Sequence, residues 1–158
     1  MPSRFPNIIF MGIKFFNRSE LTLAIQRLHL KKMFPDADCQ IHGNTLTWKG
    51  RICPTCLSDS YLVELIYRQK GSPKVFVREP QLQRRNGQRA PHLYDEGNLC
   101  LHYPDEWTPN MILSDSILPW TSEWLLHYEV WLATGEWCGG GTHPVRSQSN
   151  LETEVSNN

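Results

Sequence analysis

The chain has 158 residues and a mass of 18.4 kDa, with 40% hydrophobic and 20% charged residues, which is the size and composition of one ordinary globular domain. Sixteen Lys and Arg residues balance sixteen Asp and Glu residues, so the chain lacks the positive charge that drives non-specific binding to nucleic acid or to acidic membranes. We therefore expect a protein or a small molecule as partner, with no nucleic acid and no membrane.

The first apolar run extends from Ile8 to Ile13 and is cut by Lys14, so it is too short for a signal-peptide core or a membrane span. Five cysteines, an odd number in a chain without an export signal, argue against a disulfide framework and predict at least one free thiol. We expect a cytoplasmic protein, and the question becomes which thiol is functional.

The first half of the chain predicts one helix and three strands. The helix covers residues 19–34, stops at Pro35, and carries a predicted apolar stripe of Leu21, Ala24, Ile25 and Leu28. Strands with a period of two follow at about residues 44–52, 61–67 and 74–77. The second strand is expected to face the core with Tyr61, Val63, Leu65 and Tyr67. Three strands in sequence indicate an antiparallel meander.

The second half predicts a long loop and a second helix. Residues 79–97 lack periodicity and contain Pro and Gly, which is typical of a surface loop with a function. Residues 116–134 place aromatic side chains three or four positions apart, with Pro119 in the first turn and Gly135 as the stop, and predict a deeply packed helix. The fold class is therefore α+β, an antiparallel meander sheet flanked by N-terminal and C-terminal helices.

One segment between these helices carries chemistry. Pro91-His92-Leu93-Tyr94 leads through Asp95-Glu96 to Gly97-Asn98-Leu99-Cys100-Leu101, and Trp107-Thr108-Pro109 follows. This order resembles the active-site segment of ubiquitin-conjugating enzymes, in which a His-Pro-Asn element precedes a Gly-Asn turn, the catalytic Cys and a Trp-x-Pro. Residues 119–125 and 134–141 are similar to the small stand-alone relatives of these enzymes in bacterial antiphage (CBASS) operons, which are encoded beside a cGAS-like nucleotidyltransferase.

The resemblance implies a ubiquitin-conjugating-enzyme-like (UBC) domain, which we expect over residues 1–144. The polar composition of residues 145–158 predicts a flexible tail. The resemblance also implies a thioester-forming transferase, in which Cys100 carries the C-terminus of the cGAS-like nucleotidyltransferase, or of a ubiquitin-like partner, and passes it to an amine of an acceptor protein or small molecule. The first thioester then forms through a separate activating enzyme or by direct attack of Cys100 on a partner's peptide bond. No cofactor and no metal ion is expected.

Four residues form the candidate site: Cys100, His102, His92 and Tyr94. An acyl carrier needs an accessible thiolate, because the same sulfur attacks a carboxyl derivative and later leaves. An extended segment turns Cys100 and His102 outward together, so that His102 steadies the thiolate or accepts a proton, and turns three residues toward the core: Leu99, Leu101 and Tyr103. The family's oxyanion Asn has no counterpart, since Tyr94 stands two residues after His92; the Tyr94 phenol and the His92 ring are the candidate replacements.

Each of these residues also has a structural interpretation: Cys100 as a small apolar residue at a strand end, His92 as a histidine that ties down a loop, His102 as an exposed strand residue and Tyr94 as a packed aromatic. If all four residues have only these structural roles, the chain is a catalytically inactive binding module. The missing Asn favours this alternative, and the retained Cys100 argues against it. A thiol protease that pairs Cys100 with His92 or His143 is a further alternative.

Three other patterns have alternatives of their own. Cys53-Pro54-Thr55-Cys56 has zinc-ligand spacing that Cys138 and His143 complete, although a strand end followed by a turn explains it better. Gly139-Gly140-Gly141 is typical of a flexible exit from a helix. The arginines at 84, 85 and 89 are either solvated loop side chains or a docking surface for an acidic tail.

Overall fold

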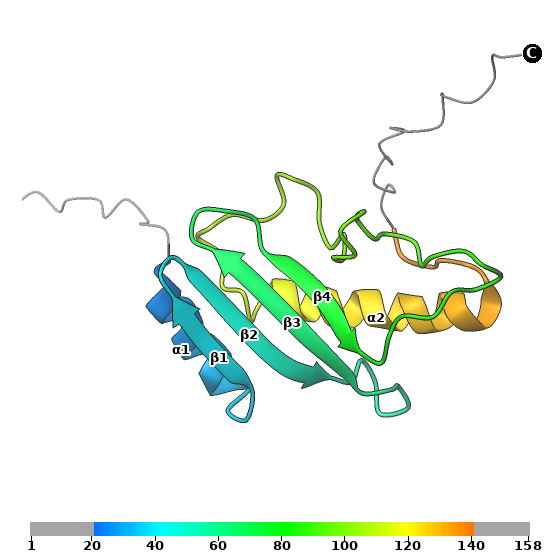
Figure 1. Ribbon diagram of the computed structural model, residues 1–158, viewed down its shortest axis with the longest axis horizontal. Coiled ribbons are helices and arrows are strands. Elements are labelled where there is room, and N and C mark those ends of the chain that lie inside the picture. The colour runs from blue at the N-terminus through cyan, green and yellow to red at the C-terminus, as the bar shows by residue number, and fades with distance from the viewer. Residues whose placement is uncertain (1–20, 141–158) are drawn as a thin grey trace, which may run out of the picture.

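The computed structural model describes residues 21–140, in which two helices flank a four-stranded antiparallel sheet (Figure 1). The elements in chain order are α1 (Leu23–Met33), β1 (Asp38–His42), β2 (Thr45–Ile52), β3 (Tyr61–Arg68), β4 (Lys74–Glu79) and α2 (Ile117–Thr134). The strand order β1-β2-β3-β4 follows the chain, so the predicted α+β meander is confirmed. In Figure 1, α1 lies beside β1 and α2 crosses behind the sheet. Neither helix of the described residues is long and apolar enough to cross a membrane.

The sheet has one strand more than the three predicted. β1 pairs with β2 from Asp38↔Lys49 to His42↔Thr45, across a turn in which Gly43 has a φ of +57°. Of the five side chains in β1, Cys39 alone is buried, so this short edge strand shows almost no hydrophobic alternation. The Gly43-Asn44 pair, a frequent hairpin turn, is the signal in the sequence that points to it.

The inner faces of β2 and β3 form the centre of the core, as the period of two predicts. The four predicted residues of β3 are at most 2% exposed: Tyr61, Val63, Leu65 and Tyr67. On β2, the fully buried Trp48 meets Phe34 edge-on, with 5.3 Å between ring centroids. A Cβ at Gly50 would overlap the Trp48 ring, so this position of β2 requires glycine.

The buried face of α1 differs from the predicted stripe. The buried residues are Leu23, Gln26 and Leu30, whereas Ile25 and Leu28 are 40% and 67% exposed. The prediction of the stripe, which counted apolar residues alone, is therefore wrong.

A glutamine can occupy the centre of this face because both polar atoms of its amide form hydrogen bonds. The Gln26 side chain donates a hydrogen bond to the Met111 carbonyl (2.8 Å) and accepts one from the Leu113 N–H (2.9 Å). A polar side chain that satisfies its hydrogen bonds can be buried without a large penalty. Gln26 thereby attaches α1 to the segment that leads into α2.

α2 begins and ends as predicted. Its aromatic residues Trp124, Tyr128 and Trp131 are buried, and Gly135 ends the helix with a φ of +88°. Glu129, near the end of the helix, accepts hydrogen bonds from the Tyr61 hydroxyl (2.9 Å) and from the Ser58 hydroxyl (2.7 Å). These bonds attach the turn between β2 and β3 to α2.

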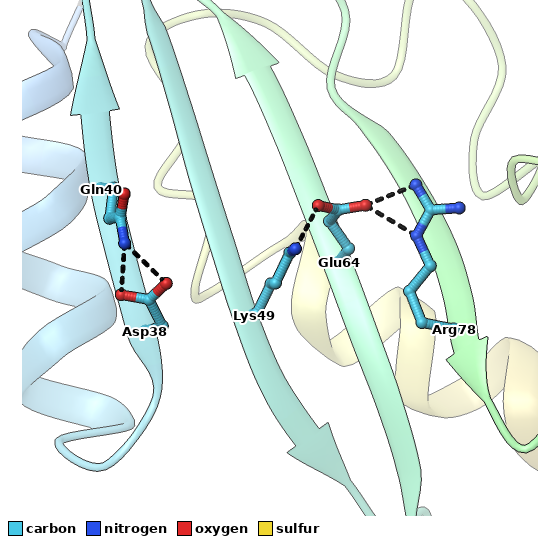
Figure 2. A network of polar contacts seen from close by, with 5 residues as sticks. All are labelled: Asp38, Gln40, Lys49, Glu64 and Arg78. Atoms are coloured by element: carbon cyan, nitrogen blue, oxygen red, sulfur yellow. Dashed lines mark hydrogen bonds and ion pairs between the residues drawn. The ribbon is translucent and has the colours of Figure 1, made fainter.

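On the outer face of the sheet, Glu64 of β3 lies between Lys49 of β2 and Arg78 of β4 (Figure 2). The Lys49 ammonium is 3.1 Å from one carboxylate oxygen, and Arg78 Nε donates to the other at 2.7 Å. Burial by itself raises the pKa of Glu64, but the hydrogen bonds from Arg78 and Lys49 outweigh it, and the net pKa is lowered.

We expect the stability that Glu64 contributes to be lost in acid. A carboxyl group whose pKa is lower in the folded chain than in the unfolded chain stabilises folding above its unfolded value of about 4.3. That contribution disappears as the pH falls through the lowered pKa of the folded state. Replacing Glu64 by Gln is expected to lower the free energy of unfolding at neutral pH by about 1–3 kcal/mol. Urea unfolding of both proteins at neutral and acidic pH measures this difference; a difference that stays the same in acid would contradict the prediction.

Candidate functional site

Cys100 lies at the end of a small hairpin formed by residues 92–100. Leu93 and Leu99 form an antiparallel bridge, and the Cys100 N–H donates to the His92 carbonyl at 2.9 Å. The turn of this hairpin contains Gly97, whose φ of +91° favours glycine. The Gly-Asn turn of the sequence motif therefore folds back so that Cys100 and His92 lie opposite each other.

Two groups of contacts hold the hairpin on the domain. The Leu99 N–H donates to the Val75 carbonyl of β4 at 2.9 Å, and at the hairpin turn Glu96 pairs with Lys74 at 2.7 Å. The hairpin thus extends the edge of the sheet beyond β4, which places Cys100 beside α2.

His92 is held in a left-handed backbone conformation, with a φ of +53°. Such a conformation costs a non-glycine residue about 1–3 kcal/mol and persists where surrounding contacts impose it. The His92 carbonyl accepts hydrogen bonds from the Cys100 N–H and from Trp124 Nε1 (3.1 Å), and its buried ring contacts Trp137 with 5.2 Å between centroids. His92 therefore sets the position of the Cys100 backbone.

The Tyr94 phenol lies beside the sulfur of Cys100. Hydrogen bonding to this sulfur, together with partial burial and the charge of Cys100, raises the pKa of Tyr94 to about 12. The phenol consequently stays protonated, and able to donate, throughout the physiological range of pH. Cys100 itself is half-buried, so it is not sealed within the core.

His102 has surroundings of its own. Its Nδ1 lies 2.7 Å from the Tyr103 carbonyl oxygen, and its ring lies 5.7 Å from that of Trp120. The segment after Cys100 is irregular, and Tyr103 is 47% exposed, so the prediction that Tyr103 faces the core is wrong. The strict alternation of an extended strand does not hold here because no neighbouring strand pairs with this part of the described chain.

Two cavities flank the Cys100 segment, and Leu101 borders both. The first, of about 160 Å³, is lined by Cys100 and His92 together with residues of α2 and of the segment after it. The second, of about 430 Å³, is lined by Tyr94 and His102 together with the turn before β4 and the hairpin turn. The four predicted residues thus gather around one segment, but His92 and His102 lie on different cavities.

The residues that line the first cavity without having been predicted as site residues include Glu123 and His127 of α2, and Trp137 after it. Figure 1 shows the orange segment that follows α2 turning back along this helix. The spacing of Glu123 and His127, four residues apart on a predicted helix, places them on one face. Nothing in that spacing reveals that the face lines a cavity beside Cys100.

Cys53 and Cys56 are exposed and not joined by a disulfide. Within residues 21–140 no group of three or more His, Cys, Asp or Glu residues is placed to hold a metal ion, and His143 lies outside the described residues.

The loop arginines donate to backbone carbonyls. Arg85 Nε binds the Leu132 carbonyl near the end of α2 at 3.2 Å, and the other two arginines bind carbonyls of the loop and hairpin, at Gly87 and Tyr94. The interpretation of Arg85 as a solvated side chain is therefore wrong: it is half-buried against the negative end of a helix.

The sequence of the chain matches a protein-family model. This model, described as Type II CBASS E2 protein, matches residues 26–144. The chain belongs to this family. The match includes the whole sheet, the hairpin with Cys100 and α2. A search of curated proteins found no match. Membership of the CBASS E2 family assigns the protein an E2-like character and a partnership within a CBASS operon.

Proposed function

We propose that this CBASS E2 protein is an acyl carrier with a ubiquitin-conjugating-like domain over residues 1–144 and a tail beyond it. Cys100 accepts the C-terminal carboxyl of a cGAS-like nucleotidyltransferase as a thioester and passes it to an amine in the cytoplasm. The observation that supports this most directly is the placement of Cys100, which is half-buried at the end of the hairpin and borders a cavity, with the Tyr94 phenol beside its sulfur.

The proposed reaction has two steps at the same sulfur. The Cys100 thiolate attacks an activated carboxyl or thioester carbonyl of the partner, and an amine later attacks the new thioester and releases the thiolate. Negative charge develops on the carbonyl oxygen in both steps. The Tyr94 phenol, which interacts with the Cys100 sulfur, is the group proposed to replace the family's Asn as the oxyanion donor.

The two histidines have different proposed roles. His92 positions the Cys100 backbone through its carbonyl. A carbonyl can only accept, so His102 Nδ1 carries the proton in its bond to Tyr103, and Nε2 is then free to accept a proton. His102 is the proposed proton acceptor on the side of the larger cavity.

The proposal is tested by incubating the full chain with the nucleotidyltransferase of its operon and with a CBASS activating enzyme. A covalent species that dithiothreitol cleaves is expected. A free fragment of the nucleotidyltransferase without an adduct would favour the thiol protease. A stable complex without any covalent species would favour the inactive binding module. Either result would overturn the proposed acyl-carrier function.

Tyr94→Phe is expected to slow the alkylation of Cys100 by iodoacetamide about three- to ten-fold, because it removes a hydrogen bond to the charged sulfur at a partly exposed site. The effect should be measurable at neutral pH, where a phenol with a pKa of about 12 is protonated and able to donate. Mass spectrometry of the alkylated Cys100 peptide gives the rate constants. His102→Ala serves as the comparison: an unchanged rate there removes His102 from the proposal, and an unchanged rate in Tyr94→Phe removes Tyr94.

A further inference from the structure

We infer that the smaller cavity beside Cys100 binds the acceptor as a primary ammonium group on an aliphatic chain, such as a lysine side chain. This inference deepens the proposed function and rests on it. It assigns binding and proton transfer to cavity residues outside the predicted site: Trp120, Glu123, Trp124, His127 and Trp137.

The cavity has the size and walls that such a chain requires. Its volume is about 160 Å³, and an apolar cavity of roughly 150 Å³ accommodates benzene, so four methylenes and a nitrogen fit. Trp120 and Trp124 of α2 and Trp137 form aromatic walls, and the rings of Trp124 and Trp137 lie 5.4 Å apart at 57°. Indole faces bind methylene groups through apolar contact and ammonium groups through cation–π attraction.

The polar groups of the cavity favour a cation. Glu123 contributes a carboxylate, and neither Lys nor Arg is among the residues that line the cavity. The Glu123 side chain is 68% exposed, which places the charge at the entrance, where a soluble acceptor arrives. The larger cavity differs, because its lining contains a cation, Lys74, and no tryptophan.

His127 stands beside Glu123, with 3.7 Å between His127 Nε2 and the nearest carboxylate oxygen. Its ring also packs 5.8 Å from the ring of Trp137. The backbone at Gly139 lies against both rings, since a Cβ there would come within 2.6 Å of Trp137 and 2.8 Å of His127. The segment after α2 therefore fixes the imidazole in the wall that it shares with Cys100.

This arrangement completes the transfer step with balanced atoms and charges. The bound ammonium gives one proton to His127, and the amine lone pair attacks the thioester carbonyl carbon. The new C–N bond forms as the C–S bond breaks, and the electron pair of that bond leaves with the Cys100 sulfur. The second proton of the nitrogen passes to the thiolate, so the products are an amide, the Cys100 thiol and one proton that His127 releases to water.

The test charges Cys100 without an activating enzyme. A glycine-terminated peptide thioester is exchanged onto Cys100, and intact-protein mass spectrometry follows the discharge of the adduct to free lysine. Hydroxylamine is the comparison nucleophile, because it is uncharged at neutral pH and needs neither a carboxylate nor a base. Glu136→Gln, an exposed glutamate outside the cavity, is the matched control variant.

We expect Glu123→Gln to slow discharge to low concentrations of lysine roughly three- to five-fold, the scale of a partly exposed ion pair. His127→Gln is expected to lower the maximal rate about 100-fold, the lower range for a general base. Discharge to hydroxylamine should be unchanged in both variants, and Glu136→Gln should match the parent protein. Equal discharge to lysine in all proteins would overturn this inference and leave the proposed carrier intact.

Two further outcomes separate this inference from the proposed function. If the variants slow the charging of Cys100 but leave the discharge to lysine unchanged, the cavity binds the peptide that is transferred and not the acceptor. This result would overturn the inference alone. If Cys100 accepts no acyl group, the proposed function fails, and a binding experiment decides whether the cavity recognises ammonium groups. In that experiment the indole N–H signals of Trp120 and Trp137 in Cys100→Ser protein are followed by NMR as butylammonium or pentanol is added. Saturation at lower concentration with butylammonium supports the cavity assignment, and an equal response to pentanol overturns it.

Discussion

Cys100→Ala is expected to abolish the covalent adduct with the nucleotidyltransferase, a loss of at least about 1,000-fold in the rate of its formation, since removal of a nucleophile eliminates the covalent pathway. Cys100→Ser should yield an adduct that survives dithiothreitol, because the oxygen ester does not exchange with thiols. Denaturing electrophoresis with and without dithiothreitol distinguishes these cases.

The other cysteines provide matched controls for this experiment. Cys53, Cys56 and Cys138 are exposed thiols, and Cys138 stands next to Gly139 at the smaller cavity. Their single replacements by alanine should leave the adduct unchanged. A labile adduct that persists in Cys100→Ala and disappears in Cys138→Ala would assign the carrier role to Cys138.

Trp124→Ala is expected to lower the free energy of unfolding by about 3–5 kcal/mol, the usual cost of emptying the space of a buried tryptophan. Trp124 is 4% exposed, its ring is stacked on Tyr128 with 5.7 Å between centroids, and its Nε1 donates to the His92 carbonyl. Urea unfolding followed by circular dichroism measures the loss. A loss below about 1 kcal/mol would show that the hairpin and α2 are not coupled through this ring.

Trp124→Phe separates packing from hydrogen bonding at the same position. Phenylalanine retains an aromatic ring in the core but cannot donate to the His92 carbonyl, so we expect a loss of roughly 1–2 kcal/mol from the missing bond. Because that carbonyl also accepts from the Cys100 N–H, the alkylation rate of Cys100 should change in this variant. An unchanged rate would mean that the Trp124 hydrogen bond does not contribute to the position of Cys100.

His92 and Trp124 together explain how the fold sets the site. The left-handed backbone of His92 is maintained by donors from two elements, one on the hairpin and one on α2. The packing that stabilises the domain is therefore the same packing that positions Cys100. Core variants along α2 are expected to affect stability and thiol reactivity together, whereas Glu64 on the outer face affects stability alone.

Local patterns in the sequence determined the α+β class, the central strands, α2 with its stop at Gly135, and the segment that contains Cys100. These features depend on alternation, helical spacing and turn residues, which are properties of neighbouring positions. The tertiary structure alone decided that Gln26 belongs to the buried face of α1, because its partners Met111 and Leu113 lie 85 and 87 residues away. It likewise placed Glu123, His127 and Trp137 beside Cys100, since side chains from two separate segments meet there only once the chain has folded.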